Sequence, residues 1–354
     1  MREEDQIYKD LELVAPGTQL YEGLENILKA RTGALIVLGD STEVLELVNG
    51  GFRIDAEMHP AALYELAKMD GALVLSSDAK KILYANTQLT PDAMIPSYET
   101  GTRHRTAERV AKQTGQLVIS ISQRRNVITI YKSNWKYILR EVSVILAKAN
   151  QALSTLEKYR SVFRQSLINL SALEFEDLVT LADVTTVLQR SQMVTRIAGE
   201  IENYVIQLGS EGRLVRMQLE ELMADIKDEG LLVFKDYFDN AEANPGDVWA
   251  EIETWDSEDL LNLNLMSKAL GYAVSLNTSD HTVAPRGYRI LAKIPRLPMP
   301  VIENLVKKFQ DLSTVMDASI EELDEVEGIG EVRAKAIKNG LRRLREQVLV
   351  DSHL

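Results

Sequence analysis

LYELAKMDGALVLS, residues 63–76, places a helical pattern, an Asp-Gly pair and a short apolar strand in direct succession. Working outward, strand-like apolar runs lie at residues 34–40, 72–77, 81–86, 117–122 and 127–132. Helical patterns lie between them at residues 20–30, 61–68 and 104–113. Strands that alternate with helices predict an α/β domain over residues 1–135. The short gap between Leu75 and Ile82 predicts a hairpin, so we expect a mixed sheet.

Residues 136–287 form a second region, which is predicted to be all-α. From Lys132 to Ala198 the sequence contains neither glycine nor proline, the two strongest breakers of regular structure. Apolar or small residues recur at steps of three or four from Ile138 to Leu170, which predicts one amphipathic helix of about nine turns. We expect this region to be a helical spine that spaces the terminal domains.

Residues 288–354 are predicted to form a small all-α domain around a glycine hairpin. Ser319 and Glu322 have the spacing of a capping box, which starts a helix. Gly328-Ile329-Gly330 then interrupts the helical pattern, and residues 332–345 hold six cations and no acid. Glycines allow backbone N–H groups to approach a phosphate, and a helix N-terminus favours an anion. Two interpretations of this hairpin therefore remain: a contact with DNA, or an ordinary helix whose basic face is solvated.

Composition narrows the classes of function. The chain has 354 residues, a formal net charge of −13 and no cysteine. The acidic balance argues against a general nucleic-acid coat protein but allows a local basic patch. The lack of cysteine excludes disulfides, thiolate catalysis and zinc-finger ligands. With neither a signal peptide nor a membrane-spanning stretch in the sequence, we expect a cytoplasmic protein without membrane partners.

The start of the third predicted helix has an unusual charge pattern. Arg103, His104 and Arg105 stand at a helix N-terminus, whose partial positive charge favours acidic side chains instead. These basic groups raise the free energy of the helix unless an anion binds there. Backbone N–H groups, the guanidinium groups and the hydroxyls of Thr102 and Thr106 suit polyphosphate.

Each of these residues also has an ordinary explanation. The basic side chains are alternatively solvated or paired with Glu99 and Glu108. Asp70-Gly71 is a common turn signal; its functional interpretation is a carboxylate that holds Mg²⁺ or Mn²⁺ beside phosphates and approaches a ribose hydroxyl. The sequence contains no Walker A motif and no G-x-G-x-x-G after a strand, which disfavours P-loop and dinucleotide-binding folds.

One pair of motifs near the N-terminus and one motif near the C-terminus resemble known families. LYELAKMDGALVLS (63–76), followed by ETGTRHRTAERVAKQTGQLVISIS (99–122), is very similar to the diadenylate cyclase domain, and the DGA plus RHR pair at this spacing is highly specific. LDEVEGIGEVRAKAI (323–337) closely resembles the helix-hairpin-helix motif of DNA repair and recombination proteins. With the helical spine between them, essentially the whole chain resembles the family of bacterial DNA integrity scanning proteins.

The resemblance implies a reaction and an assembly. Two subunits are expected to meet face to face, each with one ATP, and each ribose 3′-hydroxyl attacks the α-phosphate of the opposite nucleotide. The products are cyclic di-3′,5′-adenylate and pyrophosphate. The resemblance further implies a homo-octamer of two stacked tetramers, with the long helix from Ile138 as a candidate interface, and suppression of synthesis by branched recombination intermediates.

The resemblance also implies roles for individual residues. Asp70 is expected to bind the metal and help activate the hydroxyl, with His104 near the metal as well. The residues expected to hold phosphates are Thr102, Arg103, His104, Arg105 and Thr106. Gly71, Ala72 and Leu89 are expected to border the adenosine, and Ser122 to lie at the phosphates or sugar. Many relatives carry Glu after that serine; because the amide of Gln123 is a poorer ligand, Gln123 receives no metal role.

For the hairpin, the resemblance implies sequence-independent contact with DNA phosphates. The residues expected to make it are Gly328, Ile329, Gly330, Arg333 and Lys335. An upstream partner hairpin falls at residues 294–298, where the usual glycines are missing, so that half is expected to be structural.

Two other classes of function remain open from the sequence. One is a DNA-binding scaffold whose α/β domain only senses ATP; release of pyrophosphate from ATP with Mn²⁺ separates it from an enzyme. The other is a DNA repair nuclease. We identify no acidic cluster typical of a two-metal nuclease in the sequence, and a plasmid-nicking assay tests that class.

Overall fold

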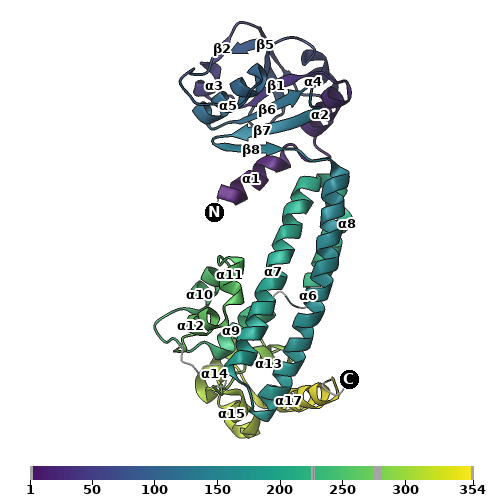
Figure 1. Ribbon diagram of the computed structural model, residues 1–354. Helices are drawn as coiled ribbons and strands as arrows, with labels where there is room; N and C mark the ends of the chain where they lie inside the picture. The colour runs from purple at the N-terminus through teal and green to yellow at the C-terminus, as the bar shows by residue number, and fades with distance from the viewer. Residues whose placement is uncertain (1–2, 225, 227, 274–280, 352–354) are drawn as a thin grey trace. The chain divides into compact units, whose positions relative to one another are not determined.

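The computed structural model describes residues 3–224, 226, 228–273 and 281–351 (Figure 1). It divides into two compact units, residues 1–151 with 201–217 and residues 152–200 with 218–354. The predicted three-domain boundaries, 1–135, 136–287 and 288–354, stay a prediction.

The first part of the chain alternates helices and strands. Its elements are α1 (Glu3–Glu12), α2 (Gln19–Lys29), β1 (Ala34–Leu38), α3 (Thr42–Leu45), β2 (Val48–Asn49), β3 (Phe52–Glu57), α4 (Pro60–Leu66), β4 (Ala72–Leu75), β5 (Lys81–Leu89), α5 (Thr102–Thr114), β6 (Leu117–Ser122), β7 (Val127–Lys132) and β8 (Trp135–Ile138).

The described remainder is helical, apart from one isolated bridge between Thr180 and Thr282. Its elements are α6 (Val142–Glu176), α7 (Leu181–Leu208), the 3₁₀ turn η1 (Gly209–Gly212), α8 (Arg213–Met223), α9 (Glu229–Tyr237), α10 (Pro245–Ile252), α11 (Ser257–Leu261), α12 (Leu263–Ala269), α13 (Tyr288–Ala292), α14 (Met299–Phe309), α15 (Leu312–Asp317), α16 (Ile320–Asp324) and α17 (Glu331–Asp351).

The strands form one mixed sheet in the order β2-β5-β4-β1-β6-β7-β8, and β3 also pairs with β5. Strands β1 and β4 run parallel, with Ile36 opposite Leu73, whereas β1 and β6 run antiparallel. Strands β4 and β5 are antiparallel, which confirms the predicted hairpin between Leu75 and Ile82. All five predicted strands are present, and the mixed α/β fold is confirmed.

Alternate residues of the central strand face two different helical layers. Ile36 packs in a core with Leu24 of α2 and Leu63 of α4. Its neighbour Val37 packs on the other face with Val110 of α5. Because successive side chains of a strand point to opposite faces, an unbroken apolar run is needed to fill both cores. The sheet is therefore covered on both sides (Figure 1).

The predicted long helix is present but begins later than expected. Ile138 is the last residue of β8, which pairs with β7, and α6 starts at Val142. The turn between β7 and β8 contains Ser133 in the left-handed region, with φ of +48°. A hairpin without glycine or proline therefore occupies a stretch whose lack of breakers favoured a helix. From Ile145 to Leu170 the predicted apolar stripe is largely buried.

The small C-terminal helical region is also confirmed. Helices α13 and α14 and helices α16 and α17 form two helix–turn–helix pairs that share one apolar core. Ile294 and Leu297, from the turn between α13 and α14, are buried in that core together with Ile329 and Ile337. The upstream turn, which lacks the usual glycines, thus contributes its side chains to packing.

Candidate nucleotide site and DNA-binding hairpin

One edge of the sheet brings together segments that are far apart in the sequence. The pairing of Ala34 with Ile121 places Gly33 beside Ser122, at the start of β1 and the end of β6. The parallel register of β1 and β4 places Asp70-Gly71 at the same edge. Asp70 is exposed and makes no hydrogen bond or ion pair with any described residue. A free carboxylate therefore lies at this edge.

The glycine after Asp70 is required by its backbone. Gly71 has φ of +100°, and a Cβ there would lie 2.8 Å from the carbonyl oxygen of Thr87 on β5. A side chain would separate the two strands at this point. The next two expected adenosine neighbours, Ala72 and Leu89, are buried and belong to the core that includes Ala107 of α5. Their side chains therefore lie below the surface at this edge of the sheet, in the core.

Arg103 lies directly over the first residue before β1. A Cβ built on Gly33 would be 2.0 Å from Nη1 of Arg103 and 3.2 Å from the carbonyl oxygen of Ile121. Only a residue without a side chain leaves room for the guanidinium group there. The first turn of α5 thus delivers Arg103 to the edge that carries Asp70 and Ser122. Gly33 was not predicted as a site residue from the sequence.

Arg103 and Arg105 at the start of α5 are not neutralised by the acids considered from the sequence. Arg105 donates from Nε to the backbone carbonyl of Glu99 at 3.4 Å. Glu108 instead bonds Lys112 at 2.7 Å. No described residue forms an ion pair with Arg103 or Arg105, and the first turn of α5 holds no acid. The cations remain available for an external anion.

His104 is held by a chain of hydrogen bonds. Tyr131 Oη lies 2.9 Å from His104 Nδ1 and also 2.9 Å from Glu99 Oε1, and Glu99 in turn bonds Lys136. Burial and the neighbouring Glu99 raise the pKa of Tyr131, so its hydroxyl keeps its proton. Although burial opposes it, the hydrogen bonds from Lys136 and Tyr131 hold the pKa of Glu99 below its ordinary value. Tyr131 therefore donates to Glu99.

This donation fixes the proton of the imidazole. Because the only hydroxyl proton of Tyr131 goes to Glu99, Tyr131 accepts from an N–H at Nδ1 of His104. Burial lowers the pKa of His104, so the ring is neutral near pH 7 and Nε2 keeps its lone pair. Nε2 is buried and has no hydrogen-bond partner among the described residues. His104 therefore offers an acceptor or a metal ligand rather than a positive charge.

A further cation lies in the turn between β6 and β7. Ser122 Oγ accepts a hydrogen bond of 3.2 Å from the backbone N–H of Arg125. The charge of Arg125 also contributes to the lowered pKa of His104, after burial, which is the largest cause. The two arginines between two apolar strands were a sequence signal from which Arg125 could have been predicted as a site residue, and that prediction was not made. Gln123 lies in the same turn and is exposed.

A resident metal would have few protein ligands here. No group of three or more His, Asp or Glu side chains that could hold a metal occurs in the described chain. Asp70 precedes β4, whereas His104 is bonded to Tyr131 on β7, and β1 and β6 separate these strands. The described residues supply no ready-made group of three ligands, and the metal role of Asp70 and His104 stays a prediction. The residues fit Mg²⁺ or Mn²⁺ only if phosphates and water supply most of the ligands.

The hairpin has the predicted capping box. Ser319 Oγ accepts from the Glu322 N–H, and the Glu322 carboxylate accepts from the Ser319 N–H. Gly328 has φ of +86°. The N–H groups of Gly328 and Gly330 donate to no group within the described chain, whereas that of Ile329 bonds Val326 at 2.9 Å. Two of the three expected backbone contacts are thus open to an anion.

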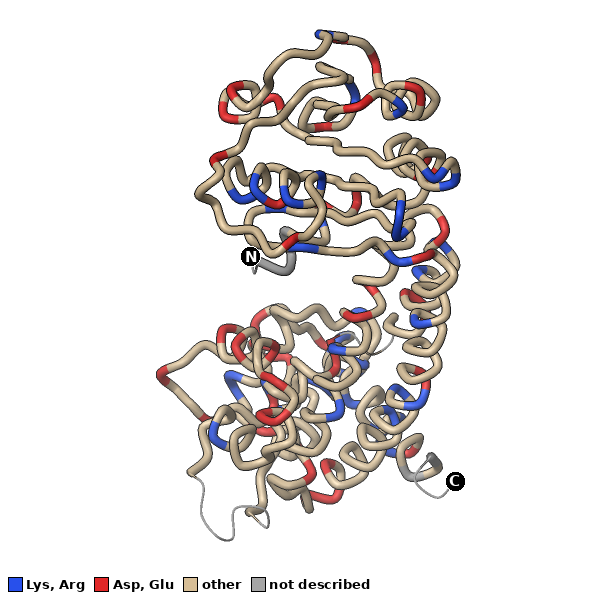
Figure 2. The backbone as a smooth tube through the Cα atoms, turned by 45° about the horizontal axis from the view of Figure 1, so that its top comes forward, with Lys and Arg blue, Asp and Glu red and all other residues tan. Residues whose placement is uncertain are grey.

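The hairpin cations differ in what they contact. Arg333 is half-buried and donates to the carbonyl of Gly328, whereas Lys335 is exposed and pairs with Glu331; both lie in the first turns of α17. Lys338 bonds the carbonyls of Met316 and Ala318 and is therefore engaged within the fold. The acidic and basic residues of both units are interspersed along the backbone (Figure 2).

The chain is similar to known proteins over nearly its whole length, and these similarities show its family. The model of the DisA bacterial checkpoint controller nucleotide-binding domain matches residues 21–135, the model of its linker region matches 139–279, and the helix-hairpin-helix motif matches 311–339. The DNA integrity scanning protein DisA of Carboxydothermus hydrogenoformans is 62% identical over 345 residues, 97% of this chain and 98% of that protein. The protein of the same name from Clostridium kluyveri is 57% identical over 352 residues, 99% of each chain.

The sheet edge, the basic helix start and these matches together define a diadenylate cyclase that uses ATP and carries a DNA-binding helix-hairpin-helix. The chain belongs to the family of DNA integrity scanning proteins named DisA. Among the described residues, no helix has the length and apolar character that a membrane span requires.

We predict that Gly33→Ala lowers cyclase turnover about tenfold while the fold is retained. The new methyl group displaces the end of the flexible Arg103 side chain, which removes one charge-assisted phosphate contact, and it meets the backbone at 3.2 Å, at the carbonyl oxygen of Ile121. The measurement is kcat/KM for ATP together with thermal unfolding. Gly199→Ala is the matched control, since a Cβ there meets nothing within 4 Å. Equal activity of wild type and Gly33→Ala would show that Arg103 does not need this position.

We also predict that Glu99→Gln moves the acidic limb of the pH–rate profile to lower pH. Burial lowers the pKa of His104 and the Glu99 charge raises it, so removal of that charge lowers this pKa further. His104 then stays neutral, with Nε2 unprotonated, to lower pH. The amide still accepts from Tyr131. The protonation of ATP itself is the same in assays of both proteins, so the difference between their pH profiles of kcat/KM reports on His104. The control is Glu46→Gln, an exposed change elsewhere, which should leave the acidic limb of the profile in place. An unchanged limb in Glu99→Gln would contradict the assignment.

Proposed function

We propose that the protein condenses two ATP molecules into cyclic di-3′,5′-adenylate with release of pyrophosphate, and that branched DNA bound at the C-terminal hairpin modulates this synthesis. The observation that carries the proposal is the set of unpaired basic side chains at the start of α5, which lies at the same sheet edge as the free carboxylate of Asp70. We further propose that the protein acts in the cytoplasm.

The positions along the edge support one orientation for the nucleotide. Asp70 and the buried Ala72 and Leu89 lie at β4 and β5, whereas Arg103 and Arg125 lie toward β1, β6 and the β6–β7 turn. The triphosphate is placed on the cationic part, with hydroxyls of Thr102, Thr106 and Ser122 as further donors. The ribose then lies toward Asp70, and the adenine toward Gly71, Ala72 and Leu89.

This orientation gives each residue a chemical task. Asp70 accepts the proton of the 3′-hydroxyl as the oxygen attacks the α-phosphorus of the other nucleotide. Arg103 and Arg105 hold the phosphates in line and offset the charge that develops on pyrophosphate as it leaves. Neutral His104 offers the Nε2 lone pair at the phosphate end of the nucleotide. Mg²⁺ or Mn²⁺, held mainly by the phosphates with Asp70 or His104 as a protein ligand, would supply further charge neutralisation.

A cyclic dinucleotide contains two new phosphodiester bonds, and their formation favours two apposed subunits. A single site would have to turn the linear intermediate over between the two steps, whereas two facing sites form both bonds without that reorientation. Met94 and Tyr98, in the segment that leads into α5, are 89% and 91% exposed, and apolar side chains in such positions are suited to an interface. We propose a homo-octamer of two stacked tetramers, with α6 as a second candidate interface, because Val144 and Val162 on α6 are also exposed.

The hairpin supplies the chemistry for contact with DNA of any sequence. The open N–H groups of Gly328 and Gly330, the half-buried Arg333 and the exposed Lys335 suit phosphate oxygens. Ile329 acts through packing, since its side chain is buried and its N–H is already bonded. Branched recombination intermediates are the DNA we propose, because they present several phosphate backbones to an oligomer that carries several hairpins.

The central experiment is incubation of Asp70→Asn and wild type with ATP and Mn²⁺, followed by mass analysis of the product. We expect wild type to form cyclic di-3′,5′-adenylate and Asp70→Asn to lose at least about a hundredfold in rate, since the amide cannot take the proton. Asp55→Asn, another exposed acid in the same unit, is the control. Normal turnover by Asp70→Asn, with the oligomer intact by light scattering, would remove Asp70 from the mechanism.

Replacement of Arg333 and Lys335 by glutamate should weaken DNA binding and reduce its dependence on salt, because fewer counterions are released, while ATP turnover without DNA is retained. Fluorescence anisotropy with a four-way junction at several salt concentrations measures both properties. The control replaces Lys307 and Lys158 by glutamate, an equal change of charge outside the hairpin. Unchanged affinity of the Arg333 and Lys335 variant would place the DNA phosphates elsewhere.

A further inference from the structure

Residues 92–99, between β5 and α5, lie outside any helix or strand but are tied to α5 along their length. We call this segment the strap. Four side chains of α5 form hydrogen bonds with its backbone: Arg105 Nε with the carbonyl of Glu99, Arg109 Nε with that of Ile95, Lys112 Nζ with that of Pro96, and Gln113 Oε1 with the N–H of Asp92. These positions are spaced to share one face of the helix. The strap therefore runs along that face and reaches the start of α5 at Glu99.

Glu108 of α5 is joined to Glu99 of the strap through a single hydroxyl group. Oε2 of Glu108 accepts from the Ser97 hydroxyl and, at 3.2 Å, from the Tyr98 N–H, while Oε1 bonds Lys112 at 2.7 Å. The Ser97 hydroxyl in turn accepts from the Glu99 N–H at 3.3 Å. Although burial opposes it, the hydrogen bonds from Lys112 and Ser97 hold the pKa of Glu108 below its ordinary value. Glu108 is therefore a charged acceptor that anchors the end of the strap.

Glu99 continues this chain of hydrogen bonds back to the start of the helix. Its carboxylate accepts from Tyr131 at 2.9 Å, and the oxygen of Tyr131 lies 2.9 Å from Nδ1 of His104. His104 and Glu108 are four residues apart, so their side chains lie about one turn apart on the same side of α5. The chain thus leaves α5 at Glu108 and returns to it at His104. Glu99 is held from two sides, by the strap at its backbone and by the sheet at its side chain.

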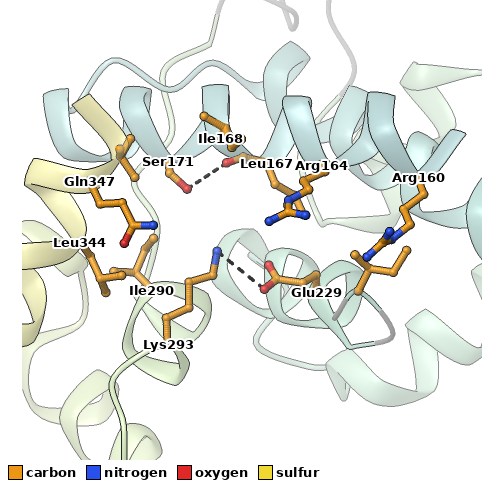
Figure 3. Close-up of a pocket in the computed structure, with 12 residues that line it drawn as sticks. Arg160, Arg164, Leu167, Ile168, Ser171, Glu229, Ile290, Lys293, Leu344 and Gln347 are labelled. Carbon is orange, nitrogen blue, oxygen red and sulfur yellow. Dashed lines mark hydrogen bonds and ion pairs between the residues drawn. The ribbon is translucent and has the colours of Figure 1, made fainter. Parts of the chain in front are cut away.

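Direct hydrogen bonds fix geometry in a way that longer ion pairs do not. In the second unit, Lys293 and Glu229 border a pocket and lie 3.7 Å apart, which is longer than a direct hydrogen bond (Figure 3). Such a pair attracts without setting the angle of either side chain. The strap, by contrast, is bonded to α5 at 2.9 Å at each of Asp92, Ile95 and Pro96. The position of α5 is therefore transmitted to the strap.

We propose that the strap orients the imidazole of His104 for the cyclase reaction, and that Ser97 and Glu108 are positioning residues that act through Glu99. The inference rests on the proposed function, in which His104 offers Nε2 at the phosphate end of the nucleotide. Misplacement of a reacting or phosphate-binding group by about 1 Å costs roughly a hundredfold in rate, so a link of this kind affects turnover without touching the substrate.

The charged groups around His104 determine what release of the strap does to its proton equilibrium. Those that face it are Glu99 on the strap, Arg103 on α5, Arg125 in the β6–β7 turn and Lys136 on β8. Burial is the largest cause of the lowered pKa of His104, the three cations lower this pKa further, and the charge of Glu99 opposes them. When Glu99 is released, the pKa of His104 falls. The ring then stays neutral to lower pH, and the acidic limb of the pH–rate profile moves in the same direction.

The test is Ser97→Ala in the full chain, which removes the hydroxyl between Glu108 and Glu99 and leaves the other bonds of Glu108 in place. We expect kcat/KM for ATP to fall about tenfold and its acidic limb to move to lower pH, with the oligomer intact by light scattering. In the Glu99→Gln background, Ser97→Ala should cause no further shift, because residues that act through one another are not additive. NMR of ¹³C-labelled histidine measures the pKa of His104 directly, without turnover.

Two further variants serve as controls. Ser97→Thr keeps the hydroxyl and should restore the acidic limb to its wild-type position. Ser77→Ala is the matched control, since it removes an exposed hydroxyl that donates to a carboxylate, that of Asp40 at 2.7 Å, in another loop of the same unit. It should leave both the rate and the limb unchanged.

Three outcomes would overturn the proposal. The first is an unchanged pKa of His104 in Ser97→Ala, which the NMR titration shows whether or not ATP is cyclised. The second is a lower rate with an unmoved acidic limb, which would give the strap a structural role only. The third is a full additional shift in the double variant, since Ser97 would then act independently of Glu99. Failure of wild type to form cyclic di-3′,5′-adenylate contradicts the proposed function instead, so the two failures are distinguishable.

Discussion

The unneutralised positive charge at the start of α5 is the constraint on which the N-terminal unit depends. A helix N-terminus already favours an anion, and the first turn adds Arg103 and Arg105 without any acid. The fold maintains this arrangement: Gly33 leaves space for Arg103, and Tyr131 fixes the ring of His104. A phosphate bound there would offset the free-energy cost of the clustered charges, so the feature that weakens the free protein would favour the proposed complex.

Burial explains which elements the sequence could predict. Strands β1, β4 and β6 lie at the centre of the sheet and are mostly buried on both faces. β1 and β4 are therefore visible as continuous apolar runs, and only serine interrupts the apolar run of β6. By contrast, β3 pairs with β5 at a bulge and has mostly exposed side chains, so it has no apolar pattern. Strand β8 follows a turn at Ser133 that contains no glycine or proline, and the local sequence therefore favoured a helix.

The candidate site shows a similar division. Charge at a helix start and a carboxylate in a turn are local patterns, so Arg103, His104, Arg105 and Asp70 could be proposed from sequence. The supporting residues are defined by contacts across the fold: Gly33 meets Arg103, and Tyr131 joins His104 to Glu99. No spacing along the chain encodes these contacts. The neutral state of His104 is likewise a consequence of burial, which a list of basic residues cannot reveal.

Whether a cation is available to a ligand depends on its neighbours rather than on its position in a basic run. Lys338 belongs to the basic stretch of α17 but is bonded to two carbonyl groups, and Arg289 is fully buried among acids. Both are part of the fold. Arg103, by comparison, has no ion pair with any described residue and lies at the sheet edge that carries Asp70. In an acidic chain such cations attract anions only locally, which allows nucleotide and DNA to bind without a general affinity for polyanions.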